Sequence, residues 1–137
     1  MQSNLQTSLY NYIKTTNTFN TSIGGRFWFN SIPKEQNVSF PYAIGTVISQ
    51  IPTRDSCDKW ERFVVQITIY QTRINSSENI LSISEKAMSL LDDCKASLSI
   101  TGYTCIDVDR TSSFEIPLDN VEYRQYQITY SIEIQKN

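Results

Sequence analysis

The sequence contains no histidine, and this absence excludes more chemistry than any other feature of its composition. Catalytic sites with a histidine base, HExxH zinc sites and histidine-based pH switches all require that residue. Glycine and proline are scarce, with 4 of each. No stretch approaches the roughly 18 apolar residues of a membrane span, and the polar first residues are not followed by the apolar core of a signal peptide.

An excess of positive charge is also absent. Lys and Arg number 12 against 14 Asp and Glu, so the net charge is -2. A protein that binds nucleic acid by neutralising phosphates carries a strong basic excess. We therefore expect no tight, charge-driven binding of DNA or RNA.

The cysteines, Cys57, Cys94 and Cys105, do not form a recognisable site. None belongs to a CxxC motif, and without histidine a zinc site would lack its fourth soft ligand. An odd number argues against a disulfide framework, so we expect small buried thiols in a reducing compartment. The sequence predicts no cofactor and no metal.

What the sequence does contain favours a sheet. Isoleucine (17) outnumbers leucine (7), alanine occurs 3 times, and Ser, Thr, Asn and Gln together number 49. Such a β-branched, polar composition is typical of strands. The 137 residues are enough for one core, and we expect residues 1–137 to form a single domain.

Hydrophobic periodicity predicts two helices, over residues 3–15 and 78–98. In the first, Leu5, Leu9 and Ile13 recur every four residues; residues 19–22 are predicted to be a loop. In the second, a stripe from Ile80 to Leu98 follows the same spacing. Asn75 to Ser77 precede this helix as a turn and capping site.

Strands are predicted at residues 26–32, 42–51, 62–73, 103–109 and 123–135, with a long charged connection over 53–61. The last strand alternates most clearly: from residue 126 to residue 134 its even positions are Tyr or Ile, and its odd positions are mostly uncharged polar residues. A strand that is apolar on one face only belongs to an antiparallel sheet with one helical layer. The expected fold is therefore an α+β two-layer sandwich in the order α-β-β-β-α-β-β, a mainly antiparallel sheet of four to five strands with two helices on one face.

Two possible sites remain. Asp107 and Asp109 share one face of a strand and could hold a divalent metal, but a charged strand end is the favoured interpretation because no nearby residue supplies the other ligands. Aromatic residues could form a stacking platform for single-stranded nucleic acid, but no basic cluster accompanies them, and core or subunit interface is the favoured role. These aromatics are Phe27, Trp28, Phe29, Tyr42 and Tyr70. No catalytic group is predicted, and we expect a protein that is not an enzyme.

The order of these elements and several short motifs resemble one protein family. Gly25-Arg26-Phe27 stands at the start of the first strand, Phe40-Pro41-Tyr42 opens the second, and Trp60 precedes the third. With the long helix and the terminal strand, this layout resembles the tail terminator, or tail completion, proteins of long-tailed bacteriophages, the group related to the lambda minor tail protein U. The resemblance extends over nearly the whole chain.

The resemblance implies a structural virion protein that is assembled in the host bacterial cytoplasm. Such a protein forms a ring, usually a hexamer, that caps the tail tube, stops its polymerisation and joins the tail to the neck of the head. Its expected partners are further copies of itself, the tail tube protein and neck or connector proteins, with DNA passing through the lumen without specific binding and with no membrane. Another neck component, a head-tail connector or a head-completion adaptor, is the alternative.

Two regions are candidates for partner contacts. Long charged loops between strands are common recognition sites, which favours four residues in the predicted connection: Arg54, Asp55, Lys59 and Arg62. The uncharged stripe of the last strand is an ordinary solvent face or a surface for another subunit. This stripe consists of Gln125, Gln127, Thr129, Ser131 and Gln135.

Overall fold

A computed structural model describes residues 2–32, 39–54, 59–72, 79–117 and 123–137 of the chain. Its elements follow the predicted order, with one additional short helix and one 3-10 turn. In chain order they are α1 (Gln2–Ile13), α2 (Thr18–Ser22), β1 (Phe27–Phe29), β2 (Tyr42–Arg54), β3 (Lys59–Thr72), α3 (Ile80–Asp92), η1 (Lys95–Ser97), β4 (Tyr103–Ile116) and β5 (Tyr123–Lys136).

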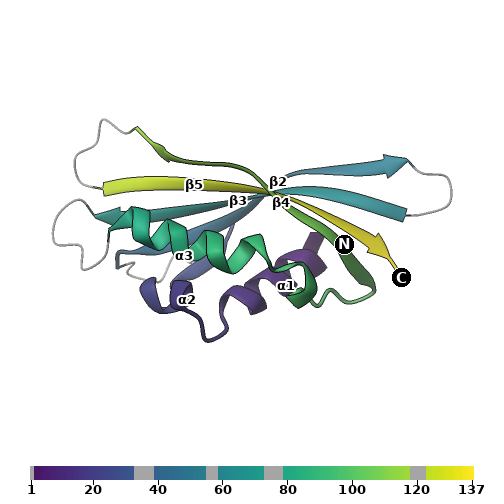
Figure 1. Cartoon of the computed structure of the whole chain (residues 1–137), viewed down its shortest axis with the longest axis horizontal. Coiled ribbons are helices and arrows are strands. Elements are labelled where there is room, and N and C mark those ends of the chain that lie inside the picture. The colour runs from purple at the N-terminus through teal and green to yellow at the C-terminus, as the bar shows by residue number, and fades with distance from the viewer. Residues whose placement is uncertain (1, 33–38, 55–58, 73–78, 118–122) are drawn as a thin grey trace.

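The five strands form one mixed sheet in the order β1-β2-β3-β5-β4. β1 runs parallel to β2, and the other neighbouring pairs are antiparallel. The three α-helices lie on one side of this sheet and leave its other side uncovered (Figure 1). The predicted α+β two-layer sandwich with a mainly antiparallel sheet is therefore confirmed, since three of the four strand pairs are antiparallel and one is parallel.

The core lies between the helices and the sheet. Leu5, Leu9 and Ile13 of α1 are buried as their spacing predicted. β5 places Ile128 and Ile134 against the same core, both fully buried. Complete burial of one such side chain stabilises the fold by about 1.5–3 kcal/mol, so this layer holds the helices on the sheet. No helix among the described residues is long and apolar enough to cross a membrane.

The second helix is shorter than its hydrophobic stripe predicted. α3 ends at Asp92, where two successive carboxylates oppose the helix dipole. Cys94 and Leu98 are nevertheless buried, because η1 and the extended residues after it cover the sheet. The stripe was misleading because these residues are buried without being helical.

The predicted loop over residues 19–22 is wrong as well. It forms α2, whose N-cap Asn17 accepts a hydrogen bond from the main-chain N–H of Asn20 at 2.7 Å. Phe19 is completely buried by this turn. A single capped turn is too short to produce a helical repeat in the sequence.

The strands on both sides of the predicted 53–61 connection are longer than expected. β2 continues to Arg54 and β3 begins at Lys59, so most of the connection is a paired hairpin. The predicted strand stopped at residue 51, before Pro52, but this proline lies inside β2, opposite Glu61. The fourth strand was also predicted too short, because β4 continues through the polar residues 110–113.

Both described cysteines are buried free thiols. Burial raises the pKa of Cys94 to about 12, and burial likewise raises the pKa of Cys105. Thiols held in the neutral form are poor nucleophiles, so these two residues act as small core side chains. Cys57 lies outside the described residues.

Candidate interaction surface on the open face of the sheet

The uncovered side of the sheet, which we call the open face, carries the alternate residues of each strand. Ala43, Ile67 and Ile128 point toward the helices and are buried, so their neighbours along each strand point the other way. Cross-strand register then assigns the rest of the face. From one end to the other it holds an aromatic cluster, an uncharged polar centre and a charged end.

The aromatic cluster joins five rings from four strands (β1, β2, β3 and β5) and the segment before β2. Tyr42 and Tyr70 stack with ring centroids 4.8 Å apart and planes inclined by 18°. Phe40 lies 5.3 Å from Tyr42 and 6.3 Å from Tyr123, and Trp28 lies 6.4 Å from Tyr42. Offset and tilted rings at these distances attract one another, so the cluster is a defined surface rather than scattered aromatics.

Tyr42 and Tyr70 of this cluster keep their hydroxyls neutral over the physiological range. Burial, followed by the proximity of Tyr70 and Tyr123, raises the pKa of Tyr42. Burial and Tyr123 raise the pKa of Tyr70 in the same way. The cluster therefore offers a partner flat rings and uncharged hydroxyl groups, a combination that is enriched at protein interfaces.

Amide and hydroxyl side chains fill the centre of the open face. The predicted stripe on β5 lies here, opposite to the buried residues of the same strand, as the alternation indicated. On β3, the side chain of Gln66 donates to the Thr68 hydroxyl at 3.2 Å. These groups can exchange hydrogen bonds with a partner at little electrostatic cost.

The far end of the open face is charged. Arg62 forms an ion pair with Glu133 of β5, in which Nε donates to Oε1 at 3.0 Å. Asp107 lies opposite Glu133 on the other side of β5. A hydrogen bond to Asp107, together with its negative charge, raises the pKa of the exposed Asp109 carboxyl. Of the four charged residues named here, three are carboxylates and one, Arg62, is basic.

Three of the four candidate contact residues, Arg54, Lys59 and Arg62, fall at this same end of the sheet. Arg54 and Lys59 lie opposite one another at the end of the described β2–β3 hairpin. Arg62 is occupied by its ion pair with Glu133, and Asp55 lies outside the described residues. The hairpin extends beyond the layer of helices (Figure 1).

The possible metal site and the possible aromatic platform both differ in the structure from what the sequence suggested. Asp107 and Asp109 do lie together, but the described residues contain no group of three or more metal-binding side chains. Of the five aromatics proposed as a platform, Trp28 joins the cluster, while Phe27 and Phe29 pack edge to face toward the helices, 5.3 Å apart. Tyr42 and Tyr70 belong to the cluster, and the sequence did not identify its other two members, Phe40 and Tyr123.

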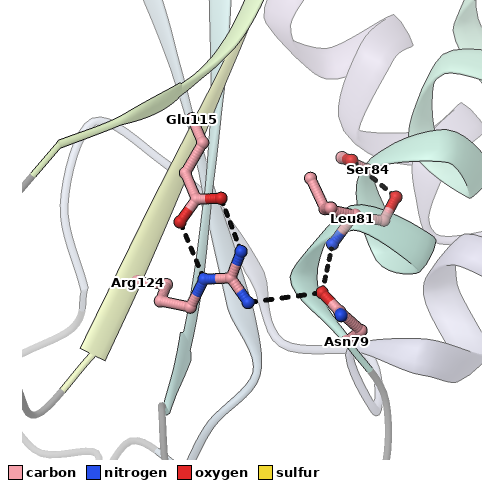
Figure 2. A network of polar contacts seen from close by, with 5 residues as sticks. All are labelled: Asn79, Leu81, Ser84, Glu115 and Arg124. Carbon is pink, nitrogen blue, oxygen red and sulfur yellow. Dashed lines mark hydrogen bonds and ion pairs between the residues drawn. The ribbon is translucent and has the colours of Figure 1, made fainter.

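A polar network on the helix side supports the strand ends beneath the aromatic cluster (Figure 2). Arg124 of β5 donates to both carboxylate oxygens of Glu115, at 2.7 and 2.5 Å. Its third contact, at 3.4 Å, is Asn79 Oδ1, which also caps α3 by accepting from the main-chain N–H of Leu81. Glu115 raises the pKa of Arg124. This network ties β4, β5 and the start of α3 together.

A hollow that is separate from the open face lies between α1 and residues 97–101. Its volume is about 490 Å³, and hydroxyl and carboxamide side chains line it. No charged side chain is among its lining residues in the described part of the chain. Ser8 Oγ is buried there without a hydrogen-bond partner among the described atoms.

Comparison with known proteins shows similarity in three dimensions. No protein-family model matches the chain, and no curated protein sequence matches it. The fold is similar to that of a chain in a solved structure described as "Virion of native gene transfer agent (GTA) particle", with a TM-score of 0.77. The similarity covers 96% of this chain and 94% of that one at 10% sequence identity. At this identity it establishes a shared fold.

Proposed function

We propose that the protein is a structural virion component, namely a tail terminator that closes the tail tube of a long-tailed phage and joins it to the neck. The observation that carries the proposal is the similarity to a chain of a virion particle, which includes nearly all of both chains. It agrees with the resemblance of the motif order to tail terminators. In this proposal residues 1–137 act as one non-enzymatic domain.

The proposed assembly is a hexameric ring of identical subunits. A closed ring needs two different surfaces on each subunit, one that meets the preceding copy and one that meets the next. The open face, with its aromatic cluster and uncharged polar centre, is the proposed surface for one of these two neighbours. A net charge of -2 also suits a lumen through which DNA slides without binding.

The hairpin is the proposed contact with the tail tube or the neck. Its candidate residues are Arg54, Asp55, Lys59 and Arg62. Because Arg62 is paired with Glu133, its proposed role is to hold the hairpin on β5, while the residues nearer the turn meet the partner. Charge reversal at Arg54 and Lys59 should therefore abolish binding to tubes while the unfolding midpoint stays the same.

Native mass spectrometry and negative-stain microscopy, with and without isolated tail tubes, test the ring and its placement. The proposal expects six-subunit rings that cap tube ends and stop elongation in a tube polymerisation assay. Monomers in the presence of tubes would refute it. The charge-reversed hairpin should form rings that no longer bind tubes.

A second position in the virion is the alternative. The description of the similar structure names a whole virion and no part of it, which suits a head-tail connector or head-completion adaptor equally. Pull-down of the purified protein with tail tubes and, separately, with portal rings distinguishes the two. Binding to the portal alone would favour the connector or adaptor.

A further inference from the structure

The two edges of the sheet differ in how their main chains are protected. Along any sheet edge, unpaired N–H and C=O groups form a template for a strand from another chain. Proteins blunt such edges with short strands, bulges and proline. Here β1 and the outer side of β2 form one edge, and β4 forms the other.

The first half of the β1–β2 edge is formed by β1, which is only three residues long. Main-chain hydrogen bonds give the orientation of β2. Ala43 N donates to Arg26 O at 3.0 Å, and Gly45 O accepts from Asn30 N at 2.8 Å. The main-chain N–H and C=O groups of residues 43 and 45 therefore point away from β3, and those of residue 44 point toward it.

A bulge and a proline protect the second half of this edge. The register shifts between Val47 and Ser49. After this bulge, the main-chain groups that point away from β3 belong to even-numbered residues, including Pro52. Proline has no N–H to offer to an added strand. The same orientation explains why Pro52 is tolerated within β2, since no hydrogen bond to β3 is lost.

Among the described residues, the bulges that protect the β4 edge lie in its first half. Bulges interrupt its register between Cys105 and Asp107 and between Arg110 and Ser112. Residues 112–116 then pair with β5 without a shift. This regular stretch has neither proline nor lysine, and its Phe114 is 48% exposed. The same alternation continues from β2 across β3 and β5 to β4. It directs the main-chain N–H and C=O groups of Ser112 and Phe114 toward β5, and those of Ser113 away from the sheet.

We propose that two copies of this chain pair along residues 112–116 of β4, antiparallel about a two-fold axis at Phe114. In this register Phe114 lies opposite Phe114 of the second copy, Ser112 opposite Ile116, and Ser113 opposite Glu115. The second bulge bounds the stretch on one side and Pro117 on the other, so its midpoint is Phe114.

This pairing is self-complementary. The one charged residue of the stretch stands opposite a serine, so no like charges face each other directly. The two Phe114 rings come together on the open face and cover each other. The outer side of β2 cannot take the place of the second β4, because its bulge and Pro52 interrupt the required row of donors. The contact has two-fold symmetry, so it is distinct from the proposed ring and does not depend on it.

Cross-linking tests the register. Residue 114 does not exchange main-chain hydrogen bonds across the axis, and Cα atoms of such opposed residues lie about 4.5 Å apart, within disulfide range. With oxidised glutathione, Phe114→Cys should form a dimer that reductant dissolves. The matched variant Ser112→Cys, two residues from the axis, should not, and neither should the parent chain. Equal cross-linking of both variants, or none of Phe114→Cys, would overturn the register.

Mass measurement tests the contact itself. Sedimentation velocity over a concentration series should give Phe114→Asp half the mass of the parent assembly, whether that assembly is a dimer or a pair of rings. Ile48→Asp is the control, since Ile48 is 52% exposed and lies on the opposite edge strand; it should leave the mass unchanged. Circular dichroism checks that both variants fold. A parent that is monomeric throughout, or a Phe114→Asp assembly of parental mass, would refute the pairing.

Discussion

The two faces of this one sheet differ in composition and in purpose. Toward the helices, Phe63, Ile67 and Ile128 are buried in an aliphatic and aromatic core. On the open face, one residue away along each strand, lie amides, hydroxyls and half-buried rings. The alternation thus separates residues that determine stability from residues available to partners. Substitutions on the two faces should therefore have different consequences, as follows from the largest effect to the smallest.

The largest loss of stability is expected from a substitution in the core. Phe63→Ala removes a completely buried ring and should lower the free energy of unfolding by about 3–5 kcal/mol. The control Gln127→Ala, on the open face, should change it by less than about 0.5 kcal/mol. Urea unfolding measures both. Similar losses from the two substitutions would contradict the division of the faces.

Gly45 offers a sharper test of packing toward the helices. A Cβ at this position would lie 2.8 Å from Phe29 Cε1 and 3.0 Å from Phe27 Cζ. Gly45→Ala should therefore destabilise the fold by about 1–3 kcal/mol, because overpacking displaces two rings. Thr46→Ala, the exposed neighbour, should be nearly neutral by the same measurement. Stabilisation by Gly45→Ala would show that the rings yield freely.

The ion pairs on the two faces should also differ. Arg124→Gln breaks the helix-side network with Glu115 and Asn79 and should cost about 1 kcal/mol, reduced by its partial exposure. Arg62→Gln on the open face, where the arginine is 45% exposed, should cost less than about 0.5 kcal/mol. Thermal unfolding of both variants compares them. The reverse order would mean that the hairpin ion pair is the stronger support.

The smallest expected effect is a change in titration on the open face. Asp107→Asn removes the neighbouring charge, so the raised pKa of Asp109 should fall toward its ordinary value. Because the fold raises this pKa, the carboxyl contributes stability below the unfolded pKa and loses it as pH rises through the folded one. Carbon-13 NMR of the carboxyl group follows the titration. An unchanged pKa would place the cause elsewhere.

The fold was largely predictable because its signals are local. Alternation in β5 and four-residue spacing in α1 reflect burial on one side, and burial is what the structure shows at Ile128 and Leu9. The ends of elements were less predictable. Cys94 continued a helical stripe while lying outside the helix. The main chain of Pro52 points away from β3 because of a bulge a few residues earlier in β2, which the sequence did not reveal.

The open face was predictable only in part. The polar stripe of β5 follows from alternation within one strand. The aromatic cluster does not, since Phe40 and Tyr123 meet across a sheet whose strand order places β5 beside β3. Neighbours of that kind depend on the pairing of distant segments, which local periodicity does not encode. The candidate contacts at Arg54, Asp55, Lys59 and Arg62 remain a prediction.

The position of β5 has a consequence for biosynthesis. It is translated after β3 and β4, yet it lies between these two strands, which do not pair directly with each other. A nascent chain that still holds β5 within the ribosome therefore has one side of β3 and both sides of β4 unpaired. The subunit completes its sheet, and hence any surface built on it, after β5 emerges. Until then, the unpaired edges of β3 and β4 are open to strands of other chains.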